Sequence, residues 1–262
     1  MTRILDEMAG DVAVSLHLMN ALEDNFIYAL MWDKKILVID PSEAAPVLHM
    51  VESEQLDLAT ILITHSHQDH IGGLSELKKK YNPYVIASDL NLIEGVDQFV
   101  GDKEELLTGP FQIVTMSTPG HCLDHISYYF KNIGILFCGD TLFGGGCGRL
   151  VQGSAKEQFT SLEQIAKLPV ETRLCFGHEY TLKNLEFAIS VGGGNEATEE
   201  RLKDTRDKRA QGHATTPSLL EIELKTNPFL RTSDPAIRAH LKMEAASDFE
   251  VFTELRAMRD RF

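Results

Sequence analysis

Four side chains of metal-ligand type lie within six residues of this chain, directly after an apolar stretch. The stretch Ala59–Ile63 has the composition of a buried strand, and His65, His67, Asp69 and His70 follow it. A polar group that is removed from water needs hydrogen bonds or an ion in compensation, so four such groups together would be costly. Metal coordination would satisfy all four, and the cluster therefore predicts a metal site at the end of a strand.

The spacing inside this cluster indicates two ion sites. His65 and His67 are two residues apart, and side chains two apart in an extended chain point to the same side. Asp69 and His70 follow in a turn toward a helix, so they can face a second centre.

Three later segments repeat the pattern of an apolar run that ends in a ligand-type side chain. A glycine, which allows tight turns and close approach, stands before the polar residue in each: Gly120-His121, Gly139-Asp140 and Gly177-His178. A rigid, preorganised site needs ligands at the ends of several strands. Together with the first cluster, His121, Asp140 and His178 complete the ligand sets for two ions.

The order of apolar segments predicts an α/β fold with a second, smaller part. Short strands alternate with helices up to about residue 178, and helical spacing dominates afterwards. We therefore expect a catalytic domain over residues 1–177 and a helical, substrate-binding domain over residues 178–262. Among the expected helices are Ala44–Glu52, Leu74–Tyr81, Ala155–Ala166, Ser218–Leu224 and Asp234–Met243.

Composition narrows the partners and the compartment. The net charge of −14 argues against a surface for nucleic acid or an anionic membrane, and no apolar run approaches the ~18 residues of a membrane span. Acidic residues occupy the N-terminus where a secretory signal would carry its apolar run. The four cysteines include no C-x-x-C pair, and Cys138 and Cys175 are expected as buried thiols. We expect a cytoplasmic monomer.

The motifs T-H-x-H-x-D-H, T-P-G-H, G-D and G-H, in this order, resemble the metallo-β-lactamase superfamily. That resemblance implies an αββα sandwich with two metal ions at one edge. It also implies the distribution of ligands: His65, His67 and His121 on one ion, Asp69, His70 and His178 on the other, and Asp140 bridging both. A donor set of nitrogen and oxygen suits zinc, and also iron or manganese.

Two ions that share a carboxylate favour hydrolysis. They can bind a bridging water and lower its pKa from about 15.7 toward roughly 7. The resulting hydroxide, held by the metal ligands with Asp69 and Asp140 among them, would attack a carbonyl whose oxyanion the ions stabilise. A thioester suits such a site because a thiolate, whose parent thiol has a pKa near roughly 8.5, leaves without strong acid help.

Further segments along nearly the whole chain resemble glyoxalase II, the hydroxyacylglutathione hydrolases. The segments are Glu23–Phe26, Gly139–Phe143, Gly145–Arg149, Gly177–Thr181, Asn227–Arg231 and Leu255–Phe262. The resemblance implies hydrolysis of S-2-hydroxyacylglutathione thioesters, such as S-D-lactoylglutathione to glutathione and D-lactate, in methylglyoxal detoxification.

The resemblance also implies that glutathione is held by Arg149, Tyr180, Arg256 and Arg259. Arg256 and Arg259 are three apart and would share a helix face, where paired guanidinium groups suit carboxylates. A solvated helix end favoured by the helix dipole is the other interpretation of these two arginines. The chain departs from some relatives in having arginine where lysine occurs at two of these positions. It also has Val151 where an aromatic residue can sit.

Several neighbours of the motifs and several other functions remain to be weighed. We expect His125 to be structural or to support a ligand, and Asp40 either to orient a ligand imidazole or to cap a turn.

A persulfide dioxygenase with one iron is the nearest alternative function, and the helical domain with the basic segment Leu255–Phe262 disfavours it. β-Lactamases usually lack the complete Asp69-His70 pair, and a nuclease should be basic. A non-catalytic scaffold would have lost some of the ligands.

Overall fold

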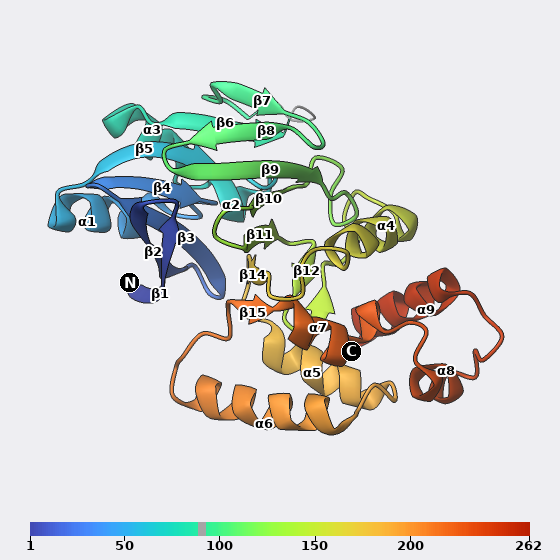
Figure 1. Cartoon of the computed structure of the whole chain (residues 1–262). Coiled ribbons are helices and arrows are strands. Elements are labelled where there is room, and N and C mark those ends of the chain that lie inside the picture. Colours follow the sequence, from blue (N-terminus) through green and yellow to red (C-terminus); the bar gives the residue numbers. More distant parts are fainter. Residues whose placement is uncertain (89–92) are drawn as a thin grey trace. The chain divides into compact units, whose positions relative to one another are not determined.

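The computed structural model describes residues 1–88 and 93–262 of the chain (Figure 1). Two compact units emerge from it. The first unit comprises Met1–Ser117 and Asp124–Gly139, and the second comprises Thr118–Leu123 and Asp140–Phe262. Each unit thus consists of one long stretch of chain and one shorter segment. Residues 118–123 belong to the second unit, and residues 124–139 belong to the first.

The first unit contains a sheet of seven strands in the order β1-β2-β3-β4-β5-β6-β7. Pairs from β1 to β4 are antiparallel and pairs from β4 to β7 are parallel. Parallel neighbours need a crossover connection, which helices supply between β4 and β6. The elements are β1 (Thr2–Ala9), β2 (Val12–Ala21), β3 (Asn25–Trp32), β4 (Lys35–Ile39), α1 (Ala44–Glu54), β5 (Asp57–Leu62), α2 (Gln68–Ile71), α3 (Leu74–Tyr81), β6 (Tyr84–Ser88) and β7 (Gln98–Val100).

Helices α1 and α3 pack against one face of this sheet. Val47 and Met50, three apart on α1, and Leu77 of α3 belong to one buried cluster with Ile27 and Val38 of the strands. Strand residues two apart point to the same face, so alternate residues of β3 and β4 meet the helices. Most of the other residues of these strands are also buried, which explains why the strands are apolar apart from Asn25 and Lys35 at their first positions.

Four more strands of the first unit pair antiparallel in the order β11-β10-β9-β8. They are β8 (Glu105–Thr108), β9 (Phe111–Ser117), β10 (Ile126–Phe130) and β11 (Ile135–Gly139). Aromatic side chains join them to the first sheet: Tyr28 of β3 meets the edge of Phe137 on β11 with ring centroids 5.4 Å apart. The buried Tyr128 of β10 donates its hydroxyl hydrogen to the carbonyl oxygen of Ile63, 2.8 Å away. Burial raises the pKa of Tyr128 well above its usual value, so the hydroxyl remains a donor.

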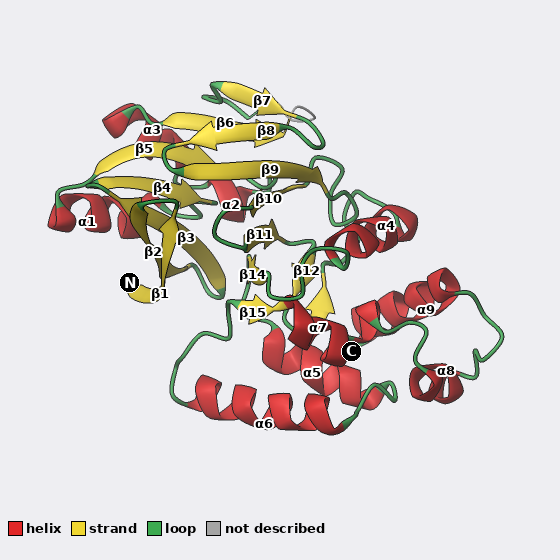
Figure 2. Ribbon diagram, in the orientation of Figure 1, coloured by secondary structure: helices red, strands yellow, loops and turns green. Residues whose placement is uncertain are grey.

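The second unit is mainly helical (Figure 2). Strand β12 pairs with β13, and β14 pairs with β15. Helices α4 and α9 both begin at capping boxes, in which a serine and the glutamate three residues later cap each other's backbone. The elements are β12 (Leu142–Phe143), β13 (Gly146–Cys147), α4 (Ala155–Ile165), β14 (Arg173–Phe176), α5 (Thr181–Ser190), α6 (Glu196–Ala210), β15 (Ser218–Leu219), α7 (Leu220–Thr226), the 3₁₀ helix η1 (Pro228–Leu230), α8 (Pro235–Leu241) and α9 (Asp248–Arg261).

The five helices named in advance are present, and four of them have limits that differ from the prediction by one or more residues. Helix α3 has the predicted limits, and Asp234 caps α8 with Pro235 at its first position, as expected. The helix predicted over Ser218–Leu224 begins only at Leu220, because β15 first pairs with β14. Local propensity could not show this, since the pairing partner lies far away in the sequence.

Two expectations from composition can be compared with the structure. All four cysteines are buried, as expected for Cys138 and Cys175. Across residues 1–88 and 93–262, no helix combines the length and the apolar character that crossing a bilayer requires.

We predict that Tyr128→Phe lowers the free energy of unfolding by about 1 kcal/mol, because the carbonyl of Ile63 loses a buried hydrogen bond. Urea unfolding followed by circular dichroism measures the change. Tyr84→Phe is the matched control, since the Tyr84 ring is exposed and its hydroxyl donates to Gln98 at 3.3 Å on the surface. Equal midpoints for the two variants would contradict the role of Tyr128.

Candidate metal centre

The first ligand group consists of His65, His67, Asp69 and His70, which the first unit brings together. The chain leaves β5, His67 stands at the N-terminal end of the one-turn helix α2, and Asp69 and His70 lie within that helix. The ring of His65 is 4.7 Å from that of His67 and 4.1 Å from that of His70, measured between centroids. His70 Nε2 is 3.8 Å from Asp69 Oδ2. The predicted clustering of these four side chains is therefore present.

Asp40, at the end of β4, determines how two of these imidazoles present their nitrogens. Its buried carboxylate accepts hydrogen bonds from His70 Nδ1 at 3.0 Å and from the Thr64 hydroxyl at 2.7 Å. Since the hydroxyl hydrogen of Thr64 goes to Asp40, Thr64 Oγ1 accepts from His65 Nδ1, 3.0 Å away. Both imidazoles then carry hydrogen on Nδ1, which leaves the lone pair of Nε2 for an ion.

Asp40 fulfils both roles that the sequence left open. Besides orienting His70, it accepts a hydrogen bond from the backbone N–H of Thr64 at 2.7 Å, which fixes the turn after β5. Its own backbone has a φ of 50°, a left-handed conformation that aspartate tolerates better than most residues.

Asn25 is a contributor that the sequence analysis missed. Its side-chain N–H groups donate to the backbone oxygen of Asp69 at 3.0 Å and to Asp69 Oδ2 at 3.1 Å. The segment Glu23–Phe26 resembles glyoxalase II, and this was the available signal, but nothing in the pattern assigned a role to the amide.

His125 and Asp124 support the first ligand group. The buried ring of His125 stacks on that of His65, with centroids 5.0 Å apart and planes 23° apart. Asp124 accepts a hydrogen bond from the backbone N–H of Ser66 at 3.0 Å. A Cβ at Gly139 would come within 2.7 Å of His125 Nε2, and its φ is 44°, so this position requires glycine.

The second ligand group consists of His121, Asp140 and His178, which are all buried in the second unit. Asp140 Oδ2 lies 3.6 Å from His121 Nε2 and 3.3 Å from His178 Nε2. His121 Nδ1 is 2.8 Å from the carbonyl oxygen of Arg149, and since a carbonyl only accepts, Nδ1 carries the hydrogen. The lone pair of His121 Nε2 is therefore directed to the Asp140 side, as in a metal-ligating histidine.

The four residues expected to hold glutathione differ in exposure. Arg149 is exposed, and the half-buried ring of Tyr180 stacks on that of His178 with centroids 5.0 Å apart. Arg256 and Arg259 lie on α9, and Arg259 donates to Asn184 Oδ1. Burial, followed by the charge of Arg256, lowers the pKa of Arg259. Arg256 is only 4% exposed.

The donor chemistry of both groups suits metal ions. Imidazole nitrogens and carboxylate oxygens are provided, and the three imidazoles with a defined Nδ1 hydrogen offer Nε2. The chain thus carries His and Asp side chains that are capable of holding metal ions. A donor set without sulfur does not distinguish zinc from iron or manganese.

Two family models together match most of the chain. The model described as metallo-beta-lactamase superfamily matches residues 28–178, and the model described as hydroxyacylglutathione hydrolase C-terminus matches residues 179–262. The hydroxyacylglutathione hydrolase of Chromohalobacter salexigens is 41% identical over 247 residues, covering 92% of this chain and 97% of that protein. The chain belongs to the hydroxyacylglutathione hydrolase family.

Other relatives agree with this membership. The hydroxyacylglutathione hydrolase of Synechocystis is 41% identical over 260 residues, covering 95% of this chain and all of that protein. Among solved structures, ETHE1 from Myxococcus xanthus has a TM-score of 0.64 at 22% identity, with 93% of this chain and 97% of that chain covered. The B3 metallo-β-lactamase BLEG-1 has a TM-score of 0.63 at 23% identity, with 82% and 99% covered. The predicted family and the metallo-β-lactamase fold are confirmed.

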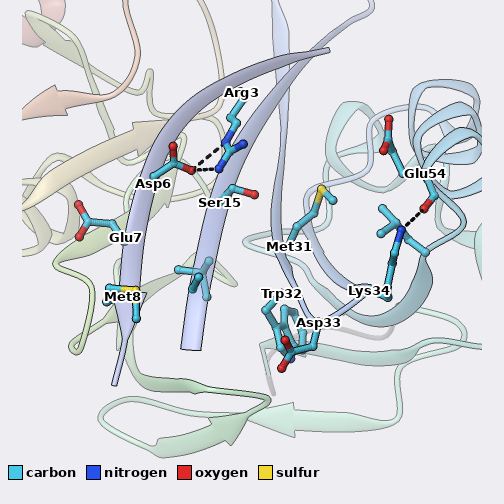
Figure 3. Close-up of a pocket in the computed structure, with 13 residues that line it drawn as sticks. Arg3, Asp6, Glu7, Met8, Ser15, Met31, Trp32, Asp33, Lys34 and Glu54 are labelled. Atoms are coloured by element: carbon cyan, nitrogen blue, oxygen red, sulfur yellow. Dashed lines mark hydrogen bonds and ion pairs between the residues drawn. The ribbon is translucent and has the colours of Figure 1, made fainter. Parts of the chain in front are cut away.

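The first unit has a hollow whose lining residues, from Arg3 to Leu56, all precede the two ligand groups in the sequence. It has a volume of about 630 Å³ and lies on β1–β3 of the first unit, beside the end of α1 (Figure 3). Among the charged residues that line it, Arg3 pairs with Asp6, and Lys34 donates to the backbone oxygen of Glu54. None of the seven predicted ligands lines this hollow.

We predict that Asp40→Asn weakens zinc binding by about 10–100-fold, the usual effect of removing a partner that orients a metal-ligating histidine. The asparagine amide is neutral and has one acceptor oxygen, whereas Oδ2 of Asp40 accepts from the Thr64 hydroxyl and His70, and Oδ1 accepts from the Thr64 backbone N–H. Competition between the metal-free protein and a chromophoric chelator measures the affinity. Asp57→Asn, at the exposed start of β5, is the control. Wild-type affinity in Asp40→Asn would contradict the orienting role.

Proposed function

We propose that this chain hydrolyses S-2-hydroxyacylglutathione thioesters, with S-D-lactoylglutathione yielding glutathione and D-lactate, in the removal of methylglyoxal. The observation that carries the proposal is the family match, which continues through the helical region to residue 262. Residues 178–262 are then the substrate-binding domain. We also propose that the protein works as a monomer in the cytoplasm, in agreement with its buried thiols.

The proposed site combines the two ligand groups around two divalent ions. One ion would be held by His65, His67 and His121, the other by Asp69, His70 and His178, and Asp140 would be shared by both. The first unit supplies His65, His67, Asp69 and His70 for this division, and the second supplies His121, Asp140 and His178. Zinc is proposed, and TTHA1623, a protein of similar fold, has been solved in a di-iron-bound form.

The chain's own residues prepare this site for hydrolysis. Bound divalent ions lower the pKa of a water molecule and polarise the thioester carbonyl. Asp40, Thr64 and the carbonyl of Arg149 keep the imidazoles in the orientation that offers Nε2. The carboxylates of Asp69 and Asp140 contribute negative charge, and Asn25 holds Asp69 in place. The thiolate product needs no general acid from the protein.

The glutathione end is proposed to lie on the basic residues of the second unit. Arg149 is exposed and Arg259 is half-buried, so both can reach a carboxylate, and Tyr180 can donate its hydroxyl hydrogen. Arg256 is included with these residues because its guanidinium holds the backbone carbonyl of Cys147, two residues before Arg149. These arginines would give an anionic tripeptide a local positive site in a protein of net charge −14.

We predict that purified protein consumes S-D-lactoylglutathione, with loss of the thioester absorbance in the ultraviolet. A strong chelator should abolish the activity, and zinc should restore it, because the attacking group depends on the ions. An intact thioester, together with oxygen consumption on glutathione persulfide, would instead identify a dioxygenase.

We predict that Asp140→Ala lowers kcat by a larger factor than the roughly 10–100-fold that is usual when a residue that only orients a metal ligand is removed. It removes a ligand that both proposed ions share, so bound metal should also fall below two equivalents per chain. Elemental analysis of the purified variant measures the metal. The control is Asp57→Asn on the exposed start of β5. Near-normal turnover of Asp140→Ala would overturn the bridging assignment.

A further inference from the structure

The short hairpin after Asp140 is held on its backbone by side chains of the helical elements. We call residues 142–148 the glycine hairpin; it contains β12, Gly144, Gly145, β13 and Gly148. The contacts to its backbone are these: Asn184 to Gly144 O at 3.1 Å, Gly145 N to Glu223 Oε2 at 2.8 Å, Asn227 to Gly146 O at 2.9 Å, and Arg256 Nη1 to Cys147 O at 2.8 Å. The hairpin's position therefore depends on α5, α7, η1 and α9.

The far end of the glycine hairpin contacts two members of the second ligand group. A Cβ at Gly148 would lie 2.0 Å from the backbone oxygen of Asp140 and 3.1 Å from His121 Cβ, so the backbone here packs directly on both ligands. The next residue, Arg149, provides the carbonyl oxygen that accepts from His121 Nδ1. A displacement of the hairpin would thus reach His121 and Asp140 without an intermediate side chain.

Arg256 contacts the last two residues of the hairpin, and both terminal nitrogens of its guanidinium are engaged inside the protein. Nη1 donates to Cys147 O at 2.8 Å and is 3.4 Å from Gly148 O, while Nη2 pairs with Asp260 at 2.8 Å. The ring of Phe229 lies 5.3 Å from the guanidinium carbon. Only 4% of Arg256 is exposed, so little of its surface is accessible to a ligand that binds from solution.

The neighbouring thiol does not neutralise this buried cation. Burial raises the pKa of the Cys147 thiol, which therefore remains uncharged at neutral pH. Compensation for Arg256 comes from carbonyl oxygens and from Asp260. The hydrogen bonds to these carbonyl oxygens therefore stabilise the buried charge of Arg256, and they also hold the backbone of the hairpin in place.

We propose that Arg256 is a positioning residue of the metal site rather than a direct ligand of glutathione. Its guanidinium fixes the carbonyls of Cys147 and Gly148, which places the Arg149 carbonyl that orients His121. Helix α9 would in this way act on the second ligand group through the glycine hairpin. The inference rests on the proposed function, in which His121 and Asp140 are metal ligands.

The test compares zinc affinity in Arg256→Met and Arg256→Lys with that of the wild type. Methionine keeps the apolar stem but removes the donors, and lysine keeps the charge but not the planar fork that reaches two carbonyls. We expect zinc binding, measured against a chelator, to weaken by about 10–100-fold in Arg256→Met and by less in Arg256→Lys. We also expect kcat for S-D-lactoylglutathione to fall at saturating zinc.

Arg238→Met is the matched control for an arginine that holds carbonyls, and the Arg238 side chain is half-buried. Arg238 donates to the backbone oxygens of Thr232 and Ala246 and pairs with Asp248, so it makes the same kinds of contact as Arg256. None of these partners belongs to the glycine hairpin. Arg238→Met should lower the thermal midpoint of the metal-free protein and leave its zinc affinity unchanged.

Several outcomes would overturn the inference. Wild-type zinc affinity in the Arg256 variants, with only KM raised, would make Arg256 a direct substrate contact. Equal loss of zinc affinity in Arg256→Met and Arg238→Met would reduce the effect to general stability. If Arg256→Met does not fold, unchanged zinc affinity in Arg256→Lys decides against the proposal. A wild-type protein that leaves the thioester intact while the zinc comparison holds would contradict the proposed function alone.

Discussion

A neutral imidazole can offer an ion only the nitrogen that carries no hydrogen, and this constraint governs the arrangement around both ligand groups. For three of the five imidazoles the chain satisfies it by giving the Nδ1 hydrogen an acceptor: Asp40 for His70, Thr64 for His65, and the Arg149 carbonyl for His121. These acceptors are themselves held by buried contacts. The ligands are consequently oriented by the protein before any ion binds, which limits the reorganisation that binding requires.

The acceptors belong to two different kinds of structure. Asp40 lies at the end of a central strand whose neighbours are buried on both faces, so the sheet and its helices fix it. The Arg149 carbonyl lies in irregular backbone after a hairpin, where regular hydrogen bonding gives little support. The side chains of α5, α7, η1 and α9 supply that support. A helical addition to this fold can therefore serve the metal site as well as the substrate.

The sequence predicted the parts of the structure that depend on local patterns. Ligand-type residues at the ends of apolar runs, the limits of α3 and the cap of α8 follow from spacing and residue type. Contacts between distant residues could not be predicted in this way. Asn25 lies 44 residues from Asp69, and Arg256 lies 109 residues from Cys147, so their partners depend on the fold. Arg256 shows the consequence: its helix and charge were predictable, but its burial was not.

The most direct test is a crystal structure of the zinc-loaded protein with anomalous scattering measured at the zinc edge. We predict two anomalous peaks, with Asp140 contacting both ions, His65, His70 and His121 coordinating through Nε2, and the Nδ1 hydrogen bonds to Thr64, Asp40 and Arg149 retained. A single peak, or coordination through Nδ1 with those hydrogen bonds broken, would contradict the account.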